Sequence, residues 1–131
     1  MAELEAPARP DLEGLRRSSE PLDVVVKELR DLLGARLVAY VAGVGETRAV
    51  HEWAEGVREV RSDEAARRLR TALQVAHLLN RRDSPEVVQA WFQGLNPQLA
   101  DRAPARLLRE GDVDEVGPQV LHAARAFAAA G

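Results

Sequence analysis

The side chains that most often carry out catalysis or bind metals are few in this chain of 131 residues, and they form no familiar arrangement. The three histidines are His51, His77 and His122, and no two have the spacing that places a pair of metal ligands on one helical face. Cysteine is absent, which excludes disulfides, thiolate nucleophiles and cysteine-bound zinc. The four serines fall in the N-terminal segment or just before expected helices, where a hydroxyl serves as a cap. We therefore expect no enzymatic activity, no metal site and no cofactor.

The segment 37–56, LVAYVAGVGETRAVHEWAEG, has side chains suited to contacting DNA. Its pattern is that of a helix-turn-helix, with a short helix, a turn at Gly43 and a second short helix that turns Val50 and Trp53 inward. In such a motif the second helix can enter the major groove, and its outer side chains reach bases and phosphates. The expected DNA-binding residues are Thr47, Arg48, His51, Arg58 and Arg61. Three glutamates between positions 46 and 55 oppose this use, because they repel the phosphate backbone.

The register of this segment departs from the usual helix-turn-helix pattern. A buried aliphatic residue usually lies six positions after the turn glycine, and here that position is Ala49, with Val50 one residue later. The sequence thus predicts either a turn that is one residue longer or an unusual register.

A second informative segment runs from 88 to 111 and contains VQAWFQGLNPQL followed by a proline, two leucines and a glycine. We expect a helix that ends in aromatic residues, an Asn96-Pro97 turn, and a short proline-started helix that returns to the core. Trp91 and Phe92 are typical core residues, with a partner-facing anchor as the alternative role.

This second segment resembles the C-terminal domain of the MbcA/ParS/Xre antitoxin family. That family has a tryptophan, Pro-Asn or Asn-Pro, a leucine, a proline, two leucines and a glycine in this order. The residues that carry the likeness are Trp91, Asn96, Pro97, Leu99, Pro104, Leu107, Leu108 and Gly111. The family's usual order is Pro-Asn, so the turn in this chain differs in detail. With the helix-turn-helix pattern included, the resemblance covers residues 22–130.

The resemblance implies an all-helical type II antitoxin that binds and blocks a RES-domain toxin, an NAD-degrading protein. It also implies a homodimer that in some members represses its own operon by binding operator DNA. The family blocks its toxin with the C-terminal end, which implies toxin-binding residues Arg125, Phe127 and Gly131. Two readings of Phe127 stay open: it anchors the toxin, or it closes the core while Arg125 faces water. The alternative function is a stand-alone helix-turn-helix transcriptional regulator.

Apolar periodicity and capping residues predict the helices that position these segments. Apolar residues recur at helical spacing from Pro21 to Gly34. Further helices are expected over 36–42, from 46 or 47 to 54, from 62 through Leu79, over 84–94 and 104–111, and after a cap at Asp112 or Asp114. Gly117-Pro118 falls in the first turns of the last helix and can delay its start. We expect an all-α protein divided into a flexible arm (1–20), a helix-turn-helix-like domain (21–82) and a helical toxin-binding domain (83–131).

Composition supports a helical protein without a membrane span. Alanine and arginine are abundant, β-branched and aromatic residues are scarce, and Lys27 is the single lysine. The net charge of −3 hides a basic middle, since residues 35–82 carry 9 basic and 6 acidic side chains. No stretch approaches the roughly 18 apolar residues of a transmembrane helix, and the N-terminus has no signal-like apolar run. The expected location is the cytoplasm.

Overall fold

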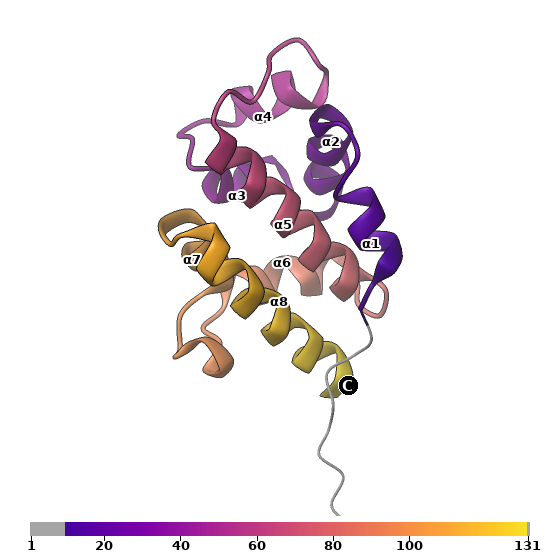
Figure 1. Ribbon diagram of the computed structural model, residues 1–131, viewed down its shortest axis with the longest axis vertical. Coiled ribbons are helices and arrows are strands. Elements are labelled where there is room, and N and C mark those ends of the chain that lie inside the picture. The colour runs from indigo at the N-terminus through magenta and orange to yellow at the C-terminus, as the bar shows by residue number, and fades with distance from the viewer. Residues whose placement is uncertain (1–9, 131) are drawn as a thin grey trace, which may run out of the picture.

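Alanine- and leucine-rich segments, separated by glycine and proline, form helices throughout residues 10–130, which the computed structural model describes (Figure 1). The described part of the chain contains no β-strand, only an isolated bridge between Asn96 and Arg102. The expectation of an all-α fold is confirmed. The elements are α1 (Leu12–Arg17), α2 (Leu22–Leu33), α3 (Ala35–Ala42), α4 (Thr47–Ala54), α5 (Asp63–Asn80), α6 (Pro85–Gln93), the 3₁₀ helix η1 (Pro97–Leu99), α7 (Pro104–Glu110) and α8 (Val113–Ala130).

The helix ends lie where the capping residues predict them. The Ser62 hydroxyl accepts a hydrogen bond from the Ala65 amide at 3.1 Å, and α5 follows it directly. Ser84 caps α6 in the same way, with Pro85 as the first helical residue. Each of these polar caps satisfies an amide that the helix itself leaves free.

Gly117-Pro118 does not delay the start of the last helix. It begins at Val113 and continues through Pro118, which lies inside it. Proline lacks the N–H that would bond to the carbonyl of Asp114 four residues earlier. Both residues are exposed, so the freed carbonyl stays at the solvent-facing side of the helix and the helix tolerates the proline.

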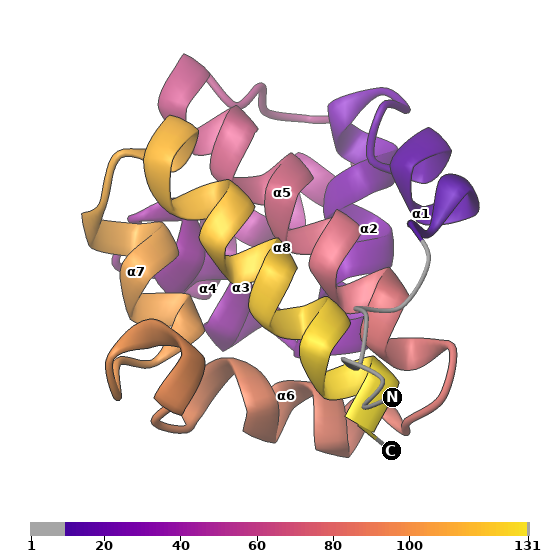
Figure 2. The ribbon, with the colours of Figure 1, turned by 60° about the horizontal axis from the view of Figure 1, so that its bottom comes forward.

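Helix α5 is the centre of the core. It packs against α8 and α2 most extensively and also contacts α3 (Figure 1). Leu69 and Leu73 on α5 are fully buried. Figure 2 shows α8 lying across α5, with α7 beside it.

One hydrophobic cluster spans the two predicted domains. Its members include Val25 and Leu73 from the segment 21–82 as well as Phe92 and Val120 from the segment 83–131. The packing of α5 on α8 and of α3 on α7 crosses the expected boundary at residue 82. Within the described residues, the apolar core is therefore shared by both segments. None of the described helices is long and apolar enough to span a membrane.

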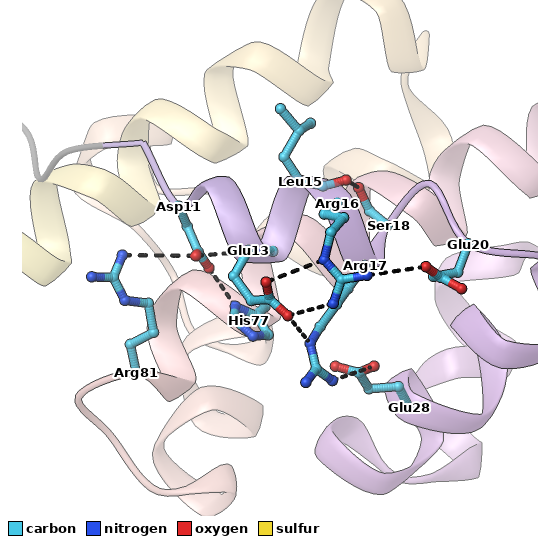
Figure 3. Close-up of polar contacts among 11 residues, drawn as sticks. Asp11, Glu13, Leu15, Arg16, Arg17, Ser18, Glu20, Glu28, His77 and Arg81 are labelled. Carbon is cyan, nitrogen blue, oxygen red and sulfur yellow. Dashed lines mark hydrogen bonds and ion pairs between the residues drawn. The ribbon is translucent and has the colours of Figure 1, made fainter.

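The expected flexible arm over 1–20 contains a docked helix, α1, in its second half; residues 1–9 lie outside the described residues. The carboxylate of Asp11 accepts a hydrogen bond from the Gly14 amide at 3.1 Å and contacts Nδ1 of His77 on α5 (Figure 3). Arg81 lies 3.8 Å from the same carboxylate. The Asp11 side chain is almost completely buried by these contacts.

Arg70 on α5 holds the segment between α1 and α2 in place through hydrogen bonds. One guanidinium nitrogen donates to the carbonyls of Ser18 and Glu20 at 2.8 and 2.6 Å. The leucines of α1, Leu12 and Leu15, are exposed, so polar contacts hold this helix. Composition misses such docking because a segment with few buried apolar residues has the pattern of a flexible arm.

Candidate partner-binding surfaces

Five of the eight residues that resemble the antitoxin motif are buried in the C-terminal part of the fold. Trp91 and Phe92 are both buried and meet edge-to-face, with ring centroids 5.5 Å apart. Leu99, Pro104, Leu107 and Leu108 are also buried. The prediction that Trp91 and Phe92 are core residues is thus confirmed.

Asn96 shapes the turn between α6 and α7. Its side-chain oxygen accepts from the Gln98 amide at 2.9 Å, and its backbone pairs with Arg102. Ala100 and Asp101 then adopt left-handed backbone conformations with φ of 56° and 61°. The side-chain role expected for Asn96 in the turn is confirmed.

Gly111 ends α7 at a close approach of the chain. A Cβ at this position would lie 2.7 Å from a methyl carbon of Val116 and 2.9 Å from the Leu107 carbonyl oxygen. Any larger residue would have to displace these neighbours, which explains on steric grounds why glycine occupies this position of the motif.

We call the partly exposed apolar side chains Val87 on α6 and Phe127 on α8 the C-terminal surface. Phe127 on α8 is 43% exposed, and its ring centroid lies 6.4 Å from that of Trp91 on α6. Val87 is 40% exposed and precedes Trp91 by one helical turn. Phe127 therefore packs against Trp91 on one side and faces solvent on the other, and its two readings stay predictions.

The other residues implied in toxin binding lie at the end of the same helix. Arg125 is half-buried, and its Nε finds no acceptor among the described residues. Arg82 donates to the carbonyl of Ala128 and so ties the end of α8 to the end of α5. Gly131 lies outside the described residues.

Helices α3 and α4 pack together on either side of a glycine turn. Gly43 has φ of 88°, which favours glycine, and its amide bonds to the carbonyl of Ala39. Ala49 and Val50 are both buried, as is Trp53 on the same face of α4. The position six residues after Gly43 therefore faces inward after all, with alanine filling it.

The predicted DNA-contacting side chains of α4 lie on its outer face, but two of the three are engaged by other residues. Arg48 and His51 are exposed and Thr47 is half-exposed. The Glu52 carboxylate accepts from Arg48 at 3.0 Å, and Nδ1 of His51 lies 3.0 Å from a guanidinium nitrogen of Arg30. These contacts compete with any bond to a phosphate.

Arg58 and Arg61 lie in the loop between α4 and α5. Arg58 also bonds to Glu52, at 3.4 Å. The hydrogen bond from Arg48, and then the one from Arg58, lowers the pKa of Glu52 below its ordinary value. Arg61 is exposed, and both arginines line a cavity of about 530 Å³ between this loop, the Gly43 turn and the start of α5.

The arginines farther along α5 serve the fold. Arg67 forms an ion pair with Asp114 on α8 at 2.7 Å, and Arg68 forms one with Glu64 at 3.3 Å. Arg70 holds the carbonyls that follow α1. The basic middle of the chain is therefore largely used in intramolecular contacts.

Sequence reasoning missed a contact that joins the two predicted domains. The guanidinium of Arg109 on α7 lies over the ring of Tyr40 on α3, 4.7 Å from its centroid, and donates to the Tyr40 carbonyl at 2.8 Å. Leu37, Val38 and Val41 are the buried large apolar residues of α3, and Tyr40 is exposed. An aromatic residue outside the apolar positions of this helix was the available sequence signal.

The described residues contain no cluster of three or more metal-ligating side chains. His51, His77 and His122 lie on α4, α5 and α8. In comparisons with known proteins, no family model, no curated protein and no solved structure matches this chain.

Proposed function

We propose that the protein is a type II antitoxin that binds and blocks a RES-domain toxin, which degrades NAD. The proposal starts from the order of residues between Trp91 and Gly111, which resembles the MbcA/ParS/Xre antitoxins. In this fold those residues are buried or shape the turn, so they specify the scaffold that presents the surrounding surface.

The exposure of Phe127 is the observation that carries the proposal. An aromatic ring that is 43% exposed, and backed by the buried Trp91, is a preorganised apolar anchor on the last turns of α8. Aromatic anchors of this kind contribute most of the binding energy in many protein interfaces. The resemblance assigns toxin blocking to the same end of the chain, and Arg125 two residues earlier supplies a cation suited to a phosphate-binding cleft.

The proposed antitoxin acts in the cytoplasm as a homodimer, and its test is a measurement of NAD. The purified chain is mixed with a RES-domain toxin at equimolar amounts, and the NAD that remains is quantified over time. We expect the intact chain to preserve NAD and Phe127→Ala to bind the toxin about 30-fold more weakly. Leu12→Ala is the matched control, because Leu12 is a 74% exposed apolar residue on α1. Loss of NAD at the same rate with and without the protein would refute the proposal for that toxin.

A second candidate function is DNA binding, either as autorepression by the antitoxin or as the role of a stand-alone regulator. It is favoured by the outward position of Thr47, Arg48 and His51 on α4, next to the Gly43 turn. This function predicts salt-dependent binding to one operator that is much tighter than binding to random duplex. Arg48→Ala would weaken it, whereas equal affinity for operator and random duplex would rule out a specific regulator.

A further inference from the structure

Helix α1 docks on the fold with its small and polar side chains inward and its apolar side chains outward. The buried residues of the segment 11–18 are Asp11, Gly14 and Ser18. Leu12 and Leu15 are instead 74% and 48% exposed. A helix of six residues is too short to be stable on its own, so α1 depends on this docking. Because the docking buries no large apolar side chain, we expect it to be reversible without loss of the core.

Beneath α1, helix α5 presents a strip of basic side chains. Arg70 and His77 are seven residues apart and Arg81 follows four residues later, so the three share one face of the helix, and we call them the α5 strip. The Asp11 carboxylate contacts His77 and lies 3.8 Å from Arg81 (Figure 3), while two backbone carbonyls that follow α1 accept from Arg70. If α1 lifts away, the strip therefore loses all of these oxygen partners.

The segment around α1 satisfies the two ends of the α5 strip unequally. Asp11 supplies a carboxylate at the His77 end, but Arg70 receives only neutral carbonyl oxygens, at 2.8 and 2.6 Å. Arg70 is half-buried and forms no ion pair among the described residues. A guanidinium binds a carboxylate more strongly than a neutral carbonyl. A ligand with a carboxylate at each end would satisfy the strip better than α1 does.

We propose that α1 is a displaceable cover of the α5 strip and that the uncovered strip binds an acidic segment of a partner protein. At 1.5 Å per helical residue, Arg70 lies about 10 Å along the axis from His77 and about 16 Å from Arg81. An extended chain rises about 3.3 Å per residue, so two acidic residues about three to five positions apart span the strip.

Two observations favour a protein segment over nucleic acid as the ligand of the α5 strip. The segment around α1 already places a carboxylate and two peptide carbonyls on it, so the strip accommodates a polypeptide. The chain also has a net charge of −3, which disfavours a long polyanion. The proposal concerns α1 and α5 and does not depend on toxin binding at the C-terminal surface.

Gly14→Ala should uncover the strip without a change of charge. A Cβ at Gly14 would lie 2.5 Å from a carboxylate oxygen of Asp11 and 3.0 Å from Nδ1 of His77, so it must displace the carboxylate that holds α1. We expect amide exchange of residues 12–18 to become about tenfold faster, with unchanged exchange in α5 and α8. Alanine favours helix more than glycine does, so faster exchange would report undocking rather than a weaker helix. Leu12→Ala is the matched control on the same helix, because Leu12 is mostly exposed.

Binding of an acidic peptide tests the uncovered strip. The probe is a capped peptide with two glutamates four positions apart, and the reference peptide has glutamines in their place. We expect Gly14→Ala to bind the glutamate peptide about tenfold more tightly than the intact chain, because the competing cover is removed. Neither the glutamine peptide nor the Leu12→Ala variant should show this gain. Equal affinity of the intact chain and of Gly14→Ala with α1 released would overturn the proposal.

A second substitution separates the strip from general attraction of anions. In the Gly14→Ala background, Arg70→Gln should weaken binding of the glutamate peptide about tenfold, because a charged donor is lost. Arg106→Gln in the same background is the matched control, since Arg106 is an exposed arginine on α7, outside the strip. Equal losses in the two double variants would contradict the site.

The remaining outcomes concern the cover and the class of ligand. Where Gly14→Ala unfolds the chain, as circular dichroism would show, Asp11→Asn replaces it, because it removes the charge and keeps the shape. Unchanged exchange of α1 in the variant used would show that α1 is a fixed part of the fold and would refute the cover. A gain in affinity for random-sequence DNA duplex, without one for the glutamate peptide, would refute a protein segment as the ligand. Each of these failures leaves the antitoxin proposal to its own NAD measurement.

Discussion

The C-terminal surface and the outer face of α4 are both exposed, but they differ in whether their side chains already have partners within the chain. On α4 the carboxylate of Glu52 engages Arg48 and Arg58, and Arg30 contacts His51. On the C-terminal surface Phe127 packs against Trp91 and is still 43% exposed to solvent. Charged side chains can find partners within their own chain and remain solvated, whereas an exposed aromatic ring gains by burial against another molecule. Because of this difference, we propose the C-terminal surface as the first candidate for partner binding and the outer face of α4 as the second.

The largest expected effect comes from removing the support beneath Phe127. Trp91→Ala deletes a buried indole that contacts both Phe92 and Phe127, and should lower the free energy of unfolding by about 3–5 kcal/mol. Chemical denaturation followed by circular dichroism measures it. Phe127→Ala, which removes a half-exposed ring from the same stack, should cost clearly less. Equal losses for the two variants would mean that Phe127 is a core residue and would remove the basis of the comparison.

A smaller loss is expected at the glycine that ends α7. Gly111→Ala places a methyl group 2.7 Å from Val116 and 2.9 Å from the Leu107 carbonyl oxygen, and should destabilise the fold by about 1–3 kcal/mol. Gly45→Ala is the control, because a Cβ at Gly45 meets nothing within 4 Å. Thermal unfolding compares the two, and equal midpoints would show that α8 shifts freely to admit the methyl group.

Much of the scaffold was predictable because its signals are local. Apolar spacing, the serines at 62 and 84 and the glycines at 34 and 43 fix where helices begin and end, and each acts within a few residues. The burial of Trp91 was predictable for the same reason, because Trp91 and Phe92 are adjacent aromatic residues near the end of α6.

The ion pairs and hydrogen bonds of the surface side chains were not predictable, because they join residues that lie far apart in the sequence. Arg67 meets Asp114 across 47 positions, and Arg109 meets the Tyr40 carbonyl across 69. Phe127 lies among alanines, so its helix carries no apolar stripe there that could reveal which face it occupies. The polar docking of α1 has no periodic signal either.

A substitution on α4 can reduce the difference between α4 and the C-terminal surface, because it frees arginines that now have a partner within the chain. Glu52→Gln releases Arg48 and Arg58 from their shared carboxylate and should make the salt dependence of duplex binding steeper by about one to two phosphate contacts. Fluorescence anisotropy at several salt concentrations measures the slope. Glu55→Gln removes the same charge from the end of α4 but releases no arginine among the described residues. A slope that is equal in both variants would show that net charge, rather than the ion pairs, limits DNA binding.

The smallest effect is expected at α1, which polar contacts attach to the fold. Hydrogen bonds from Arg16, and then from Arg17, lower the pKa of Glu13 from about 4.5 to about 2 (Figure 3). A carboxylate whose pKa is lowered by folding stabilises the folded state fully above its unfolded pKa, and this contribution is lost as protons bind to it. The contribution of Glu13 should therefore be present above pH 4.5 and decline as the pH falls towards 2. It should remain small because Glu13 and both arginines are exposed to solvent. Amide exchange of residues 12–18 in the intact chain and in Glu13→Gln should differ slightly at pH 6 and converge near pH 2. A difference that persists at pH 2 would mean that Glu13 acts through its shape rather than its charge, so the attachment of α1 would not depend on this ion pair.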